Sequence, residues 1–179
     1  FYPDGVSTLL VLKRNRCKHL ERLPTTDVGW HLLEYKKPHL TTLGIVGGNT
    51  LVNDAVKRIF IDKGFEVLWN FNGFTELDDS LNQELPSPDS IVVGLGMPLE
   101  MEHGLKLLDL HPNSRILTCG GWFNFIAGFE KRAPKLMQHY GLEWVWRLSI
   151  NPKRLLRRYF EGAIYTLKMI MKRQSGIKL

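Results

Sequence analysis

The sequence has few of the features that mark a secreted or membrane-spanning protein. It contains two cysteines, Cys17 and Cys119, too few for a disulfide framework, which favours a reduced, intracellular setting. No uncharged apolar run approaches the roughly 18 residues that a membrane-spanning helix needs. The first residues lack the basic and apolar segments of a signal peptide. We therefore expect a protein that can touch a membrane but does not cross it.

Motifs for metal, nucleoside triphosphate and serine-hydrolase chemistry are also absent. No Asp-x-Asp motif is present to hold a divalent metal against a nucleotide sugar, and the six histidines show no metal-ligand spacing. The sequence has no Walker-type loop and no Gly-x-Ser-x-Gly motif. We predict a protein without a metal site and without a cofactor.

Positive charge is concentrated in the C-terminal part of the chain. Residues 1–130 contain 12 lysines and arginines against 16 acidic residues, a net charge of −4. Residues 131–179 contain 12 basic residues against Glu143 and Glu161, a net charge of +10. This asymmetry indicates an anionic partner: the phosphates of a substrate, anionic lipid headgroups or nucleic acid.

Strand-like apolar runs alternate with helical patterns in the first two thirds of the chain. The glycines that follow several of these runs are typical of a parallel α/β sheet. Ligands of such sheets bind beyond the carboxyl ends of the strands, so the turns after residues 46, 93 and 119 should line one site. The expected strands are residues 43–46, 65–69, 90–93 and 115–119, and the expected helices are residues 51–63, 77–85 and 100–110.

From residue 133 the pattern changes to helices separated by Pro134, Gly141 and Pro152. The last of these helices, expected at residues 152–173, carries an apolar stripe and seven basic residues. It is either a surface helix packed on the core or an interfacial membrane helix, and its cationic bias favours the second. We predict an α/β core over residues 1–132 and a basic amphipathic helical appendage over residues 133–179.

Some residues suit catalysis as well as structure. The Gly47-Gly48 turn precedes a predicted helix, whose first N–H groups can bind a phosphate, although many such turns bind nothing. Asp4 is either a turn residue or a general base. Glu100 and Glu102 are equally ambiguous, because exposed carboxylates are common at helix starts.

Four arginines cluster around Pro152. Guanidinium groups suit a diphosphate, and residues one helical turn apart share a face. The alternative is a solvated basic face. These residues are Arg147, Arg154, Arg157 and Arg158.

Several segments follow the order and spacing of one known family over residues 2–160. In the C-terminal part they are residues 120–128 (GGWFNFIAG), 131–134 (KRAP), 141–148 (GLEWVWRL) and 152–159 (PKRLLRRY). Upstream they are residues 3–5 (PDG), Arg22 with Asp27, 43–48 (LGIVGG), 72–74 (NGF) and 93–98 (VGLGMP). On these segments the chain resembles the WecG/TagA/CpsF glycosyltransferases, glycosyltransferase family 26.

This resemblance implies a Rossmann-like α/β core with a helical C-terminal appendage, and about one further α/β unit ahead of Phe1. It implies an inverting, metal-independent transfer of an N-acetylmannosamine-type sugar or a related hexose. The donor would be the UDP-sugar and the acceptor a polyprenyl-diphosphate-linked sugar. The enzyme would be peripheral, at the cytoplasmic face of the cell membrane, and would serve the synthesis of a cell-surface polysaccharide.

The resemblance also implies roles for residues. The residue matching Asp4 is the family's proposed general base, which takes the proton of the acceptor hydroxyl. The arginines matching Arg147, Arg154 and Arg157 would reach over the active site and stabilise the leaving UDP. Glu100 stands where the family has a substrate-contacting glutamine. The substrate-binding positions are Arg22, Asp27, Gly47, Gly48, Asn72, Gly73, Gly94, Gly96, Glu100, Gly120 and Gly121.

Two other functions stay open. An inactive or fragmentary homologue would act as a membrane-associated binding module. A nucleic-acid-binding protein would stack bases on the aromatic residues of the basic part. Those aromatic residues belong to the family's segments, however, so we expect no nucleic-acid partner. The sequence leaves a homo-oligomer open.

Overall fold

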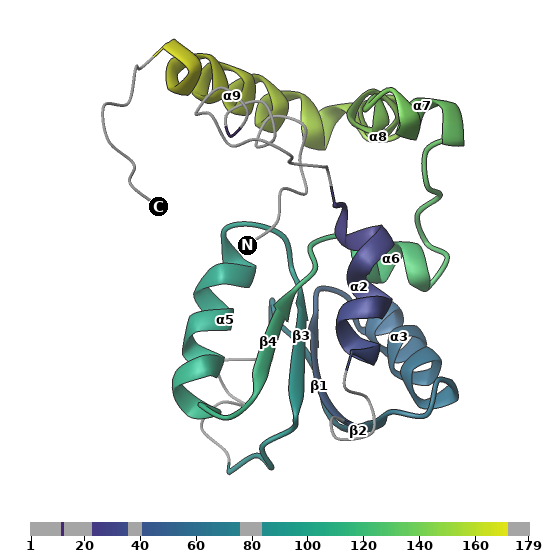
Figure 1. Cartoon of the computed structure of the whole chain (residues 1–179), viewed down its shortest axis with the longest axis vertical. Coiled ribbons are helices and arrows are strands. Elements are labelled where there is room, and N and C mark those ends of the chain that lie inside the picture. The colour runs from purple at the N-terminus through teal and green to yellow at the C-terminus, as the bar shows by residue number, and fades with distance from the viewer. Residues whose placement is uncertain (1–11, 13–22, 36–40, 76–83, 172–179) are drawn as a thin grey trace. The chain divides into compact units, whose positions relative to one another are not determined.

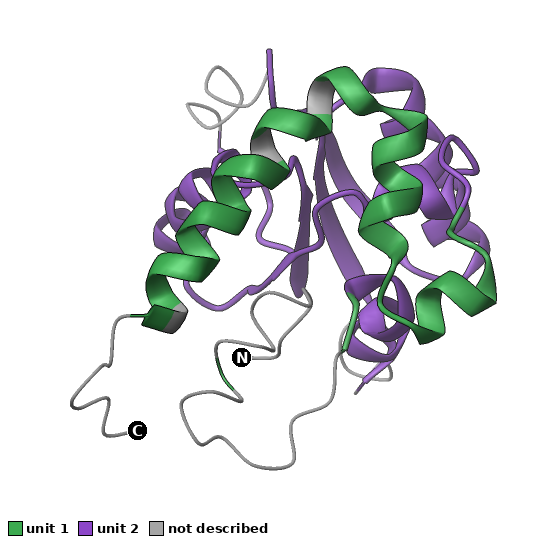
Figure 2. Ribbon diagram, turned by 90° about the horizontal axis from the view of Figure 1, so that it is seen from above, with its two compact units in different colours: residues 1–24, 132–179 green, residues 25–131 purple. Residues whose placement is uncertain are grey.

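The computed structural model describes Leu12 and residues 23–35, 41–75 and 84–171, without the side chains of Arg154, Arg158 and Ile170. The chain divides into two compact units (Figure 2). Residues 25–131 form the α/β unit, and residues 132–179 together with 1–24 form the C-terminal unit. The division into domains that the sequence predicts, at residue 132, stays a prediction.

The α/β unit is built on a parallel sheet with the strand order β2-β1-β3-β4 (Figure 1). The sheet and its flanking helices confirm the predicted Rossmann-like α/β fold. Because the strands are parallel, their carboxyl ends meet at the same edge. The strands are β1 (Thr42–Gly47), β2 (Glu66–Asn72), β3 (Ser90–Gly94) and β4 (Arg115–Thr118).

Helices cover both faces of this sheet (Figure 1). On one face lie α2 (Thr25–Glu34), α3 (Thr50–Asp62) and α6 (Trp122–Ile126), and on the other lies α5 (Leu99–Leu110). Side chains alternate between the faces along each strand, so two apolar clusters form. The first contains Leu43, Ile45, Val52, Val56, Phe60, Val92, Trp122 and Phe123, and the second Val46, Trp69, Ile91, Val93 and Leu107.

Polar contacts join the elements at the amino ends of the strands. One carboxylate oxygen of Asp89, just before β3, accepts hydrogen bonds from the backbone N–H groups of Thr41 and Thr42, both at 2.9 Å. The hydroxyl of Thr42 donates to the same oxygen at 2.7 Å. Arg115, at the start of β4, donates to the carbonyl oxygen of Leu32 in α2 at 2.8 Å. These contacts fix the sheet at the edge opposite the glycine turns.

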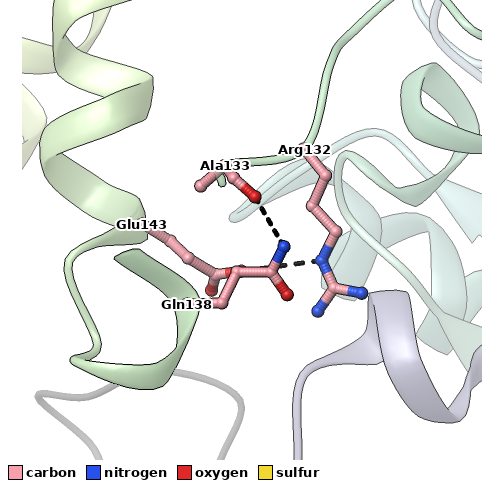
Figure 3. A network of polar contacts seen from close by, with 4 residues as sticks. All are labelled: Arg132, Ala133, Gln138 and Glu143. Atoms are coloured by element: carbon pink, nitrogen blue, oxygen red, sulfur yellow. Dashed lines mark hydrogen bonds and ion pairs between the residues drawn. The ribbon is translucent and has the colours of Figure 1, made fainter. Parts of the chain in front are cut away.

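The C-terminal unit consists, in its described part, of α7 (Lys135–His139), α8 (Glu143–Ile150) and α9 (Pro152–Met171), which confirms the predicted helical appendage. Gln138 Nε2 donates a hydrogen bond to the carbonyl oxygen of Ala133 (Figure 3). Arg132 Nε lies 3.6 Å from Glu143 Oε1. This ion pair joins the irregular segment that precedes α7 to the first turn of α8.

Candidate functional site

Four turns follow the carboxyl ends of the four strands, at one edge of the sheet. Gly47, the last residue of β1, pairs with Asn72 of β2 on one side and with Gly94 of β3 on the other. In β3 and β4, Val93 pairs with Thr118. The fold therefore gathers nine of the predicted substrate-binding residues on or beside these turns. They are Gly47, Gly48, Asn72, Gly73, Gly94, Gly96, Glu100, Gly120 and Gly121.

Neighbouring side chains occupy the space beside the glycines that end β1 and β3. A Cβ atom on Gly47 would lie 1.8 Å from Asn53 Oδ1, and one on Gly94 would lie 2.7 Å from Cδ2 of Phe123. Both positions need glycine because the aromatic ring and the amide pack directly on the backbone. A role of Gly47 and Gly94 in binding substrate stays a prediction.

Asn49 caps the helix that follows the Gly47-Gly48 turn. Its side-chain oxygen accepts hydrogen bonds from the N–H groups of Leu51 at 2.9 Å and Val52 at 3.4 Å. A phosphate at this helix start would have to displace the asparagine or use other N–H groups. The sequence did contain the signal for this cap, because asparagine is a preferred residue directly before a helix.

An exposed aromatic ring covers the turn after β1. Phe74, which is 57% exposed, follows β2, and a Cβ atom on Gly48 would lie 2.5 Å from its ring. Asn72 Oδ1 accepts a hydrogen bond from the Phe74 N–H at 3.0 Å and so fixes the turn that carries the ring. The family resemblance implies that Asn72 binds substrate; the structure shows this local contact, and the role in substrate binding stays a prediction.

The turns after β3 and β4 differ, because open space lies over their glycines. Gly96 (φ +79°) and Gly120 (φ +54°) adopt the left-handed backbone region that favours glycine. Among the described residues, a Cβ atom on Gly96 would meet nothing within 4 Å, and one on Gly120 would meet only Glu100 Oε2, at 3.9 Å. Within the described part of the α/β unit, side chains therefore leave more room at these two glycines than at Gly47 and Gly94.

A cysteine and a carboxylate lie beside these open turns. Glu100 and Cys119 are both buried. Burial, and in second place the negative charge of Glu100, raise the pKa of the Cys119 thiol well above its usual value. The thiol therefore stays protonated at neutral pH and is not a nucleophile. Within the described ranges, no group of three His, Cys, Asp or Glu side chains is placed to hold a metal ion.

The remaining acidic and basic candidates of the N-terminal part are Asp27, Asp4 and Arg22. Asp27 is exposed in the first turn of α2, a helix that packs on α6 where Gly29 meets the ring of Trp122. Asp4 and Arg22 lie outside the described residues. Their roles in catalysis and substrate binding stay predictions.

The three candidate arginines belong to the C-terminal unit. Arg147 is exposed on α8. Arg157 is exposed on α9, where its Nε donates to Glu161 Oε1 at 2.8 Å. Arg154 also lies in α9, but its side chain is outside the described part. Their convergence over the substrate stays a prediction.

Comparison with known proteins matches the chain to a family and to a named relative. A model of the "Glycosyl transferase WecG/TagA/CpsF family" matches residues 1–178. The chain is also 27% identical over 161 residues to N-acetylglucosaminyldiphosphoundecaprenol N-acetyl-beta-D-mannosaminyltransferase of Bacillus spizizenii. That match covers 87% of this chain and 62% of the relative, so the chain spans less than two thirds of the relative's length.

Proposed function

Because the chain belongs to the WecG/TagA/CpsF family of glycosyltransferases, we propose that it transfers a sugar from a UDP-sugar to a polyprenyl-diphosphate-linked acceptor. The relative from Bacillus spizizenii is named for an N-acetylmannosaminyl donor group and an N-acetylglucosaminyl-diphospho-undecaprenol acceptor. We extend that pair of substrates to this chain, where the product would enter a cell-surface polysaccharide.

The single observation that carries this proposal is the edge of the sheet where the four turns gather. A parallel α/β sheet binds its ligand beyond the carboxyl ends of its strands. At this edge the turns after β3 and β4 leave their backbone open, at Gly96 and Gly120. Beside them, Phe74 offers an exposed ring that suits a nucleobase. The edge therefore supports a nucleotide-sugar donor.

We assign the general base to Asp4 from its place in the family's first segment. The acceptor hydroxyl oxygen attacks the anomeric carbon of the donor sugar, and the carbon–oxygen bond to UDP breaks. The hydroxyl proton passes to the carboxylate of Asp4, and UDP leaves with the bonding electron pair. Attack from the face opposite the leaving group inverts the anomeric configuration.

The leaving UDP gains negative charge, which cations must stabilise. We assign this role to Arg147, Arg154 and Arg157. Arginine remains charged and presents paired donors that match phosphate oxygens. With these residues in place the reaction would need no metal ion, in keeping with a sequence that lacks the Asp-x-Asp motif.

The outer face of α9 supports docking on an anionic membrane. In the described part of the chain, no helix is long and apolar enough to cross a bilayer. Instead, α9 contacts α8, and the ring of Tyr159 in α9 packs edge-on against that of Trp144 in α8. Leu155 of α9 is buried. Another stripe of apolar side chains on α9 stays exposed. It consists of Leu156, Phe160, Ile164, Leu167 and Met171.

Spacings of three and four residues place this stripe on one face of the helix. Its apolar groups would enter the headgroup region, and the net charge of +10 over residues 131–179 would attract anionic lipids. The diphosphate of a lipid-linked acceptor lies at the same depth. We therefore place the enzyme, as a peripheral protein, at the cytoplasmic face of the membrane.

A transfer assay tests the function. The protein is incubated with labelled UDP-N-acetylmannosamine and a short-chain N-acetylglucosaminyl-diphosphate lipid, and the lipid fraction is analysed for label and anomeric configuration. Appearance of a disaccharide lipid whose new glycosidic bond has the inverted anomeric configuration supports the proposal. If vesicle binding persists while no UDP-sugar is consumed, the chain is a binding module without transferase activity.

A further inference from the structure

Glu100 is a buried carboxylate that accepts hydrogen bonds from the backbone of two turns of the site. It lies in the first turn of α5 and is 7% exposed. One oxygen, Oε2, accepts hydrogen bonds from the N–H of Gly96 at 3.2 Å and from the N–H of Gly120 at 2.8 Å. A single atom thus links two turns that are far apart in the sequence.

These two turns are the open ones at the carboxyl edge of the sheet. Gly96 follows β3 and Gly120 follows β4, and no apolar side chain of the described residues packs on either glycine. By contrast, the glycines that end β1 and β3 pack against Asn53 and Phe123. At Gly96 and Gly120 the hydrogen bonds to Glu100 supply a link between the two turns that side-chain packing on these glycines does not supply.

The link is strong for two reasons. The backbone N–H of Glu100 donates to the carbonyl oxygen of Gly96 at 3.1 Å, so these two residues are joined in both directions. Hydrogen bonds from N–H groups to an ionised carboxylate are shorter and stronger than those between neutral groups. The start of a helix also favours a negative charge.

We propose that Glu100 is a positioning residue, which fastens the turn after β3 to the turn after β4 and so fixes the backbone that meets the donor's diphosphate. The expected effect on sugar transfer rests on the proposed function. The expected effect on the two turns rests on the geometry alone. While the carboxylate holds the N–H groups of Gly96 and Gly120, these groups are not donors to a substrate phosphate. Glu100 acts through the two turns instead of contacting the sugar.

Three variants test the proposal. Glu100→Ala removes the link, and Glu100→Gln keeps an oxygen that can accept both hydrogen bonds. Glu102→Ala is the matched control, because Glu102 is an exposed glutamate in the same turn of α5. Two experiments are carried out on each variant. The first measures amide hydrogen exchange at Gly96 and Gly120 in the ligand-free protein, and the second measures KM and kcat for the UDP-sugar.

In Glu100→Ala we expect both amides to exchange at least about tenfold faster, as expected for the loss of a charge-assisted hydrogen bond. The donor KM should rise by a similar factor, with a smaller change in kcat. Glu100→Gln should recover part of both effects, since the acceptor oxygen is retained while the charge that strengthens the hydrogen bonds is lost. Glu102→Ala should change neither.

The proposal is overturned if both amides stay protected in Glu100→Ala, or if Glu100→Gln is as impaired as Glu100→Ala. The second outcome would assign the effect to the charge or to direct contact with substrate. If the alanine variant does not fold, Glu100→Asp replaces it, because its shorter side chain cannot reach both N–H groups. Amide exchange decides on Glu100 even if the wild-type protein transfers no sugar.

Discussion

Gly47 and Gly94 are paired in register on β1 and β3, and the ring of Phe123 packs against the backbone of both. A Cβ atom on either glycine would lie within 3 Å of Cδ2 of that ring, at 2.9 Å and 2.7 Å. Phe123 is buried in the short helix α6, directly after the turn that follows β4. The ring thus packs on the ends of β1 and β3 from the short helix that follows β4.

The packing of Phe123 on the backbone of Gly94 predicts that Gly94→Ala destabilises the protein. The added methyl group would force the ring of Phe123 to move, and overpacking of this kind typically costs about 1–3 kcal/mol. Urea denaturation measures the change in the free energy of unfolding. Gly121→Ala is the control, because its Cβ atom would meet only Phe125, at 4.0 Å. Equal stability of the two variants would show that Phe123 does not constrain the edge.

Acid should weaken the contact between Asp89 and Thr42. Hydrogen bonds from the backbone N–H and hydroxyl of Thr42, and then from Thr41, lower the pKa of Asp89, although burial acts in the opposite direction. A carboxyl group whose pKa is lower in the folded state stabilises the fold above its unfolded pKa, about 3.9. That stabilisation is lost as the pH falls through the folded pKa.

Asp89→Asn should therefore lower the free energy of unfolding at pH 7 by about 1–2 kcal/mol. The difference from the wild type should shrink in acid, as the pH falls through the lowered pKa of Asp89. Asp109→Asn, on the exposed side of α5, is the control and should have little effect. A difference that stays constant between pH 7 and pH 3 would mean that the ionised carboxylate contributes nothing.

The apolar stripe of α9 predicts where membrane binding can be broken. Phe160→Asp and Leu167→Asp should each weaken co-sedimentation with anionic vesicles by about tenfold or more, because a large apolar side chain can no longer enter the lipid. Tyr165→Asp places the same charge on the other side of the helix and should have a much smaller effect. High salt should weaken binding of all forms. If all three variants were equally impaired, the added negative charge, and not the loss of the apolar stripe, would explain the weaker binding.

Metal independence predicts that turnover survives a chelator. If Arg147, Arg154 and Arg157 stabilise the leaving UDP, excess EDTA should leave the rate unchanged. Arg147→Ala should lower kcat, and added Mg²⁺ should not restore it. A strict requirement for Mg²⁺ or Mn²⁺ would contradict this assignment.

The regular part of the fold follows from the sequence. The apolar runs at residues 43–46 and 90–93 became β1 and β3, and the helical patterns at residues 51–63 and 100–110 became α3 and α5. Periodicity identifies such elements because each buries one continuous face. The short helix α6 had no such signal, since its five residues are placed by tertiary packing of Trp122 and Phe123.

The gathering of the glycine turns was predictable, but the packing at each glycine was not. Glycines after strands predicted turns at one edge of a parallel sheet, as the sheet has them, yet sequence cannot distinguish a glycine that leaves room for a ligand from one that leaves room for Phe123. Similarly, Glu100 suggested a contact with substrate, whereas its carboxylate oxygen binds the N–H groups of Gly96 and Gly120. These distinctions depend on which distant side chain fills each space, and local pattern carries no information about that.

The most direct test of the central claim is the rate of sugar transfer by Asp4→Asn beside the wild type. The assay uses a UDP-sugar donor and a soluble lipid-diphosphate acceptor, and Asp62→Asn at the exposed end of α3 serves as the matched control. Our account predicts transfer by the wild type and the control, and a roughly 10²–10⁴-fold lower turnover in Asp4→Asn with unchanged thermal stability. Turnover of Asp4→Asn within a few-fold of the wild type would contradict it.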